Sequence, residues 1–163
     1  MSETKPTIGV IGANDATEEQ MLLACELGHH IAARGAVLVC GGRGGIMEAV
    51  SKGVHERGGT VVGILPGTDK SEANPYVHIS IPTGFGIARN VVVVHASDVI
   101  IAFPGAYGTL SEIAVAMEMK KTVICMPGAW GLQKIAPVDM TLFKEASDPR
   151  QAIGLALTAL SGV

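Results

Sequence analysis

Aromatic residues, excess basic charge and long apolar runs are all scarce in this chain, and each shortage excludes a class of function. Aromatic side chains make up 4% of the 163 residues, too few for a stacking surface that would bind single-stranded nucleic acid. The net charge is −3, which also argues against a DNA or RNA partner. The most apolar stretch is interrupted by His95, Ser97 and Asp98, well short of a membrane span. We therefore expect neither a nucleic-acid partner nor a membrane partner.

Cysteine is sparse as well. Cys25, Cys40 and Cys125 lie far apart in apolar stretches, without the spacing of metal ligands, so we expect reduced, buried thiols and no metal site. No apolar segment of the secretory kind follows the first six residues, and we expect a cytoplasmic protein. His29 and His30 fall near the end of the first predicted helix, where positive charge suits the helix dipole. We interpret them as surface residues, with a ligand-binding role as the alternative.

Apolar residues and glycine are abundant, at 48% of the chain and 21 residues respectively. Short apolar runs, typical of buried strands, alternate with segments of helical periodicity. Strands are predicted over residues 7–12, 36–40, 60–65, 76–81, 99–103 and 122–126. Residues 86–95 are predicted as a helix despite their run of valines, because a parallel sheet needs a crossover there. Residues 66–75 and 127–138 are predicted loops, and a last helix is predicted to begin at Asp148 or Pro149.

This alternation predicts one α/β domain over residues 1–163, with a doubly wound parallel sheet and helices on both faces. Glycine-rich turns follow the first, second and fifth predicted strands, at residues 12–15, 41–45 and 104–108. The carboxyl ends of parallel strands meet at one edge of the sheet. The backbone N–H groups of these turns can therefore hold an anion at that edge.

The predicted anion-binding residues all lie in or directly after these turns. They are Gly12, Gly42, Arg43, Gly44, Gly45, Gly105, Ala106, Tyr107, Gly108 and Thr109. Gly105 and Gly108 are expected to allow positive φ and a close approach of the ligand to the backbone. Arg43 could pair with a phosphate or remain solvated, and the pattern leaves both open. Neither the dinucleotide fingerprint nor a P-loop is present.

Two charged side chains are predicted at the same edge. Arg89 falls in the early turns of the third helix, and Glu112 falls in the first turn of the helix after the fifth strand. A carboxylate beside a phosphate site suggests a function. Thr109 and Glu112 also have the spacing of a capping box, in which each side chain satisfies a backbone N–H group of the other residue. The two interpretations of Glu112 are compatible.

The segment Pro104–Glu112 resembles the Pro-Gly-Gly-X-Gly-Thr-X-X-Glu motif of the LONELY GUY (LOG) superfamily of Rossmann-like proteins. In that superfamily an arginine lies 15 residues before the motif proline, and Arg89 has this spacing from Pro104. Residues 41–48 resemble its first glycine turn, so the likeness covers almost the whole chain. Members named for LOG release an adenine-type base from a nucleoside 5′-monophosphate. For them the resemblance implies Arg89 and Glu112 as the catalytic pair.

The chain departs from those enzymes at three points. Ala106 replaces the second motif glycine, Asn90 stands where they carry lysine, and their upstream histidine is missing, with Ile87 and Ala88 in that region. The layout of residues 84–90, together with the short chain, looks more like the branch that contains molybdenum cofactor carrier proteins. Members of that branch bind a pterin with a phosphate tail and have no known chemistry.

We therefore expect the protein to bind a phosphorylated heterocycle, with the molybdenum cofactor as cargo. A phosphoribohydrolase is the alternative. In that reaction Glu112 would stabilise positive charge on the ribose or activate water, and Arg89 would hold phosphate or ribose hydroxyls. A dinucleotide-dependent oxidoreductase is disfavoured, because no acidic residue ends the second strand at Cys40. No lysine has a context suited to pyridoxal phosphate, so the superfamily's older lysine decarboxylase label has no support either.

Assembly is the last expectation. Residues 91–94 are all valine, which on a helix leaves more apolar surface than one face of the sheet can cover. We expect part of this run at a subunit interface, in a homo-oligomer that is a dimer or a tetramer.

Overall fold

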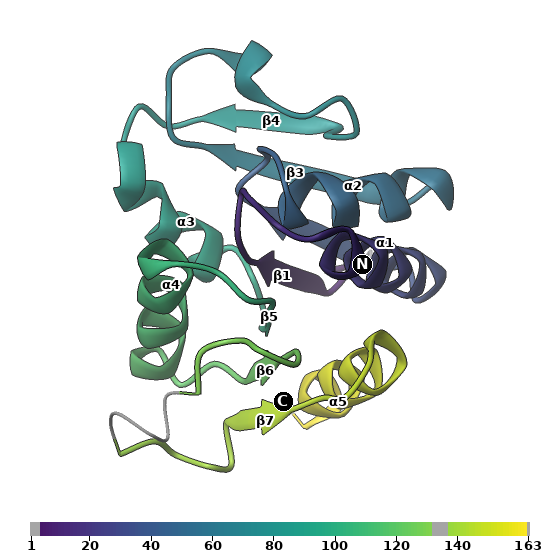
Figure 1. The fold of residues 1–163 in the computed structure, drawn as a ribbon, viewed down its shortest axis with the longest axis vertical. Coiled ribbons are helices and arrows are strands. Elements are labelled where there is room, and N and C mark those ends of the chain that lie inside the picture. Colours follow the sequence, from purple (N-terminus) through teal and green to yellow (C-terminus); the bar gives the residue numbers. More distant parts are fainter. Residues whose placement is uncertain (1–3, 132–136, 163) are drawn as a thin grey trace.

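The computed structural model describes residues 4–131 and 137–162 of the chain, and within these ranges seven strands form one parallel sheet (Figure 1). The strand order is β4-β3-β2-β1-β5-β6-β7. The strands are β1 Thr7–Ile11, β2 Val37–Cys40, β3 Thr60–Leu65, β4 Ile79–Pro82, β5 Val99–Ala102, β6 Val123–Cys125 and β7 Phe143–Glu145. The order reverses between β1 and β5, which pair directly. The predicted doubly wound, Rossmann-like fold is therefore confirmed.

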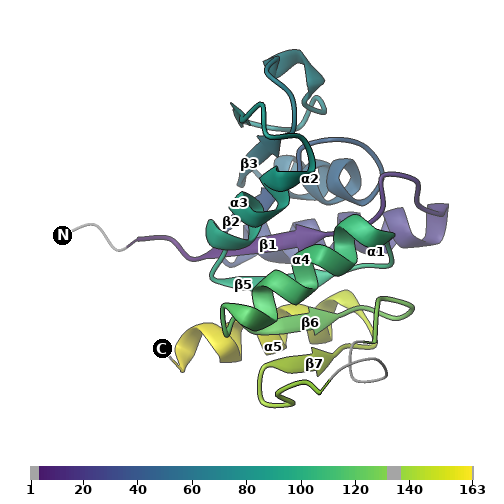
Figure 2. The ribbon, with the colours of Figure 1, turned by 90° about the vertical axis from the view of Figure 1, so that its left-hand side faces the viewer.

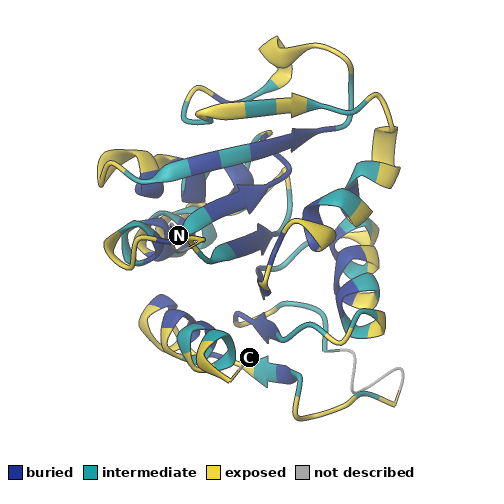
Figure 3. Cartoon of the chain, turned by 180° about the vertical axis from the view of Figure 1, so that it is seen from behind, coloured by how far each residue is buried: buried dark blue, intermediate teal, exposed yellow. Residues whose placement is uncertain are grey.

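Helices cover both faces of the sheet. They are α1 Glu18–Ala33, α2 Ile46–Glu56, α3 Arg89–His95, α4 Tyr107–Glu118 and α5 Pro149–Ser161. Figures 1 and 2 show α1, α2 and α5 on one face and α3 and α4 on the other. Successive residues of a strand point to opposite faces of the sheet. Ile101 belongs to the core cluster that includes residues of α1, whereas Ile100 belongs to the cluster that includes residues of α4. The buried residues form the middle of the molecule in Figure 3, with the outer faces of the helices exposed.

Local sequence signals explain where the longest helices begin and end. Thr17 caps α1 in a capping box with Gln20, and Gly35 follows its end with φ of +69°. At the start of α5 the Asp148 carboxylate accepts a hydrogen bond from the backbone N–H of Gln151, and Pro149 takes the first helical position. The start of α5 agrees with the predicted one.

The strand prediction was wrong in one place. β7 was missed, because it has only three residues and its single large apolar side chain is the fully buried Phe143. The predicted fourth strand is shorter than expected and ends in Pro82, which an edge strand tolerates. Part of the predicted loop 127–138, residues 132–136, lies outside the described residues.

The valine run is helical, as predicted, and it divides between core and surface. Val93 and Val94 are fully buried, while Val91 is exposed. Cys40 and Cys125 are buried as expected, but Cys25 is only partly so. In the described part of the chain, no helix is both long and apolar enough to cross a membrane.

Candidate functional site

A cavity of about 390 Å³ opens at the carboxyl ends of β1 and β5, where the strand order reverses. This edge cavity is lined by Val10, Ile11, Gly12, Ala13, Asn14, Asp15, Gly41, Met47, Arg89, Asn90, Ala106, Gly108, Thr109 and Glu112. A second hollow of about 500 Å³ adjoins it and shares Ala13, Asp15 and Ala106. Ligands of doubly wound proteins bind at this reversal point.

The structure brings half of the predicted site residues to the edge cavity. Those that line it are Gly12, Arg89, Ala106, Gly108, Thr109 and Glu112. Those that do not line it are Gly42, Arg43, Gly44, Gly45, Gly105 and Tyr107. Arg89 from α3 and Glu112 from α4 therefore line the same cavity.

Residues 42–45 of the second glycine turn do not line the cavity and instead pack against the turn after β1. The Gly44 N–H group donates to Asn14 Oδ1 at 3.0 Å, so this amide is already used within the protein. Gly45 has φ of +60°, and a Cβ atom there would lie 2.3 Å from the carbonyl oxygen of Ala13. Arg43 is exposed, and its backbone carbonyl accepts a hydrogen bond from Asn74. This turn thus packs against the turn after β1 and holds it in place.

The start of α4 is open to the cavity. The helix begins at Tyr107, no side chain caps it, and the N–H groups of residues 107–109 donate to no described residue. The predicted capping box is therefore wrong, because Thr109 lies within the first turn of the helix and not before it. Its side chain packs over Gly105, where an added Cβ would lie 2.1 Å from the Thr109 hydroxyl oxygen. Gly105 and Gly108 also lack the expected positive φ. Free N–H groups and the helix dipole favour an anion at this end.

Trp130 supports the same helix start, and the sequence pattern did not assign it a role. Its indole Nε1 donates to the carbonyl oxygens of Gly105 at 2.9 Å and Ala106 at 3.2 Å. The ring of Tyr107 stacks on it with centroids 6.4 Å apart. Tyr107 is 80% exposed, so a flat ring lies at the rim of the site.

Arg89 is held in place by backbone carbonyls. One guanidinium nitrogen, Nη1, donates to the carbonyl oxygens of Gly41 at 2.5 Å and Ile64 at 2.6 Å, while Nε donates to Asn90 Oδ1 at 3.0 Å. Burial lowers the pKa of Arg89 from its ordinary value, and the nearby Glu112 opposes that change. The second amino nitrogen, Nη2, donates to no described residue. The arginine thus joins the ends of β2 and β3 and keeps one nitrogen for a ligand.

Glu112 is buried, with 8% of its surface exposed, and it forms no ion pair with Arg89. Burial raises the pKa of Glu112 to about 8, and the charge of Arg89 offsets this only in part. At neutral pH the carboxyl group therefore keeps its proton. A neutral carboxylic acid can both donate and accept a hydrogen bond, as the edge of a heterocycle requires.

Asn90 and Asn14 are site residues that sequence reasoning missed. Asn90 is 8% exposed and connects Arg89 to the carbonyl oxygen of Gly108, to which its Nδ2 donates at 3.4 Å. Asn14 joins the turns after β1 and β2. The position of Asn90 directly after the arginine was the available signal. Asn14 falls in the predicted turn of residues 12–15, but nothing in that pattern assigned a role to its side chain.

Known proteins resemble this chain over nearly its whole length. The molybdenum cofactor binding protein of Rippkaea orientalis superposes with a TM-score of 0.90 at 38% identity, covering 98% of this chain and 99% of that one. The molybdenum cofactor carrier protein of Chlamydomonas reinhardtii gives 0.89 at 37% identity, with 97% and 99% coverage.

A cytokinin riboside 5′-monophosphate phosphoribohydrolase of Arabidopsis thaliana is 39% identical over 93 residues. That match covers 55% of this chain and 41% of the enzyme, so this chain spans about two fifths of that relative's length. The model of the SLOG cluster4 family, by contrast, matches residues 5–155. The resemblance to LOG-like proteins is thereby confirmed, and this chain belongs to the SLOG cluster4 family.

Proposed function

We propose that this protein binds a phosphorylated heterocycle in the edge cavity and acts as a carrier-like binding protein for the molybdenum cofactor. The observation that carries the proposal is the end-to-end match with the two molybdenum cofactor proteins, which leaves almost no part of either chain unmatched. The geometry of the cavity supports it in two respects, one for the phosphate and one for the ring system.

The phosphate of the ligand fits the start of α4. The N–H groups of residues 107–109 have no described acceptor, and the positive end of the helix dipole lies there. Arg89 adds a fixed positive charge with one free nitrogen. The adjoining hollow of about 500 Å³ extends the space available to a ligand beyond the edge cavity.

The ring system fits the neutral polar groups that line the cavity. Glu112 with its proton, together with the amides of Asn90 and Asn14, offers both donors and acceptors to a heterocycle. In this assignment Glu112 is a binding residue. The phosphate-binding residues are those at the start of α4, and the glycine turn of residues 42–45 contributes only by holding the turn after β1 in place.

The second candidate is hydrolysis of a nucleoside 5′-monophosphate. Its support is that Arg89 and Glu112 line one cavity and that the Arabidopsis phosphoribohydrolase is a partial relative. In that reaction a carboxylate must stabilise positive charge on the ribose or activate water. The raised pKa of Glu112 keeps most of this group in the neutral form at pH 7, which disfavours the carboxylate role that this reaction assigns to it.

The test measures both activities on one preparation. Protein produced in a host that makes the molybdenum cofactor should co-purify with molybdenum and with pterin fluorescence. The same protein, incubated with nucleoside 5′-monophosphates, should release no free base. Base release that is lost in Glu112→Gln, by about a hundredfold or more, would replace the carrier proposal with the hydrolase. Absence of both cofactor and base release would overturn both.

Gly108→Val should abolish retention of the cofactor. A Cβ at Gly108 would lie at an ordinary 3.5 Å from Asn90, and its backbone is not left-handed, so the fold accepts a side chain there. The valine would project into the cavity beside the free N–H groups. The matched control is Gly154→Val on the exposed face of α5, where a Cβ meets nothing within 4 Å. Equal molybdenum content in the two variants would argue against this phosphate site.

We further propose that the chain forms a homo-oligomer, a dimer or a tetramer, through the segment that leads into α3 and the first turn of that helix. Phe85, Ile87 and Val91 are 63%, 73% and 42% exposed. Three large apolar side chains so close in sequence indicate a covered surface. Light scattering should give a multiple of the 16.8 kDa chain mass, and Ile87→Asp should shift it toward the monomer. A wild-type monomer at micromolar concentration would exclude this interface.

A further inference from the structure

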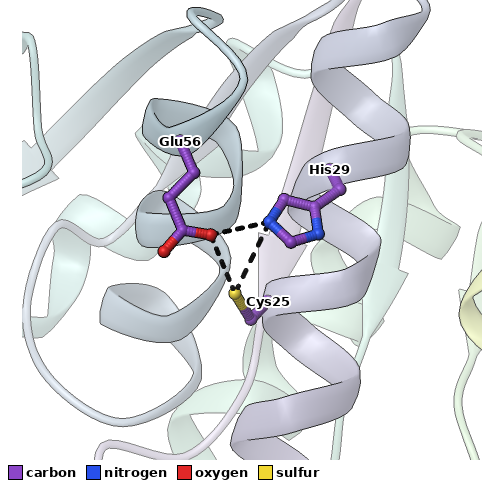
Figure 4. Close-up of side chains that lie close together, drawn as sticks. All are labelled: Cys25, His29 and Glu56. Carbon is purple, nitrogen blue, oxygen red and sulfur yellow. Dashed lines mark hydrogen bonds and ion pairs between the residues drawn. The ribbon is translucent and has the colours of Figure 1, made fainter.

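Three side chains with metal-binding atoms meet on the α1–α2 face, apart from the edge cavity (Figure 4). Cys25 and His29 lie one turn apart on α1, and Glu56 is the last residue of α2. His29 Nε2 lies 2.7 Å from Glu56 Oε2, and Cys25 Sγ lies 4.0 Å from the imidazole nitrogen and 3.8 Å from the carboxylate oxygen. We call these three residues the Cys25–His29–Glu56 cluster. None of them lines the edge cavity.

Two glycines fix the spacing of this cluster. A Cβ at Gly53 of α2 would lie 2.0 Å from the carbonyl oxygen of Cys25, and a Cβ at Gly28 of α1 would lie 2.4 Å from that of Val50. The two backbones therefore touch, which only glycine permits at such a crossing. Because the helices cannot slide or separate without losing this contact, the three ligand atoms are held close before any metal binds.

The ligand set and its geometry suit a tetrahedral transition-metal ion. Thiolate, imidazole and carboxylate together are typical of zinc, with bonds of about 2.3 Å to sulfur and about 2.0 to 2.1 Å to nitrogen or oxygen. Those bonds place tetrahedral ligand atoms about 3.3 to 3.6 Å apart. The three distances in the cluster bracket these values, so rotamer adjustments of a few tenths of an ångström at each side chain are enough.

We propose that the Cys25–His29–Glu56 cluster binds one Zn²⁺ ion, with water as the fourth ligand, a site that goes beyond the proposed cofactor-binding function. When the ion binds, Cys25 releases its thiol proton to solvent, and His29 gives up the Nε2 proton that bonds Glu56 Oε2 in the metal-free protein, so that it binds through Nε2 as the neutral tautomer protonated at Nδ1. Lys52 lies 3.8 Å from the other carboxylate oxygen of Glu56, Oε1, which leaves Oε2 for the metal. Cys25 also lines a hollow of about 440 Å³, through which water reaches the sulfur atom.

The first experiment uses the untagged full-length protein with Co²⁺ as a spectroscopic substitute for Zn²⁺. One equivalent of Co²⁺ should bind, with the visible bands of a tetrahedral ion and the near-ultraviolet band of sulfur-to-cobalt charge transfer. Zn²⁺ should displace it at a ratio of one to one. Binding without the charge-transfer band would exclude Cys25 as a ligand and overturn the proposal, as would no binding.

The second experiment compares variants. Cys25→Ala and His29→Gln should weaken Zn²⁺ binding by at least about a hundredfold, since even the loss of an outer partner costs 10- to 100-fold. The matched control is His30→Gln. His30 is the neighbouring histidine and pairs with Glu26 at 3.7 Å, in an ion pair that involves no cysteine. Circular dichroism establishes that each variant is folded. Equal affinity in Cys25→Ala and His30→Gln would overturn the proposal.

Discussion

Replacing Glu112 by glutamine is expected to remove a pH dependence from the stability of this protein. The pKa of Glu112 is raised by burial to about 8 in the folded state, against 4.5 for the free group. Between these two values the folded chain holds one proton more than the unfolded chain at this position. The free energy of unfolding therefore falls as the pH rises, by about 1.4 kcal/mol per pH unit from this group alone.

The sign follows from the direction of the pKa change. The stabilising contribution of the protonated Glu112 is complete below the unfolded pKa and is lost as the pH rises toward about 8. A glutamine side chain has no such proton. The free energy of unfolding of the Glu112→Gln variant should therefore rise steadily relative to that of the wild type across this range. Above about pH 8 the variant should be more stable than the wild type by several kcal/mol, on the order of the full pKa difference expressed as a free energy.

Urea unfolding at a series of pH values measures this effect as the difference between the two proteins. Other titrating groups contribute equally to both and cancel. Glu118→Gln, on the exposed side of the same helix, is the matched control and should run parallel to the wild type. Stability curves of wild type and Glu112→Gln that stay parallel from about pH 5 to pH 8 would contradict the burial argument.

Replacing Arg89 by alanine is expected to damage both the fold and the site. The change leaves the carbonyl oxygens of Gly41 and Ile64 without their donor, and hydrogen bonds from a charged group contribute about 1.5 to 3 kcal/mol. We expect the free energy of unfolding to fall by about 2 kcal/mol or more. The free guanidinium nitrogen is lost too, so cofactor retention should drop by at least about tenfold.

Arg89→Lys separates the two effects. An ammonium group can still reach a carbonyl oxygen, but it lacks the planar fork that donates to the protein and the ligand together. Lysine should therefore restore part of the stability and little of the cofactor retention. Arg34→Ala, an exposed arginine after α1, controls for the loss of a positive charge. Full cofactor retention in Arg89→Lys would show that Arg89 has only a structural role.

Much of the site could be predicted from the sequence, because it depends on the order of elements along the chain. An apolar run followed by a glycine turn and a helical repeat places the turn at the carboxyl edge of a parallel sheet, whatever the details. Arg89 and Glu112 were placed at one edge by this reasoning, and both line the edge cavity. The capping signals of α1 and α5 are equally local, since they involve residues within one turn of each other.

What the sequence left undecided depends on contacts between segments far apart in the chain. α4 begins at Tyr107, before Thr109, and the distant Trp130 binds the carbonyl groups of Gly105 and Ala106 at this start, so the capping box that the spacing suggested does not form. β7 forms because its three residues pair with the free edge of β6. In both cases a hydrogen bond joins segments far apart in the chain, which a local propensity does not register.

The sequence by itself determined the fold class, the edge of the sheet that holds the candidate site, and the pair Arg89 and Glu112 that lines its cavity. Only the tertiary structure decided which glycines line the cavity, that Glu112 is buried enough to hold its proton, and that Glu56 reaches Cys25 and His29 from another helix. The physical reason is that burial and ligand geometry belong to packed surfaces. The crossing of α1 and α2 at Gly28 and Gly53 creates one such surface, and no spacing along the chain encodes it.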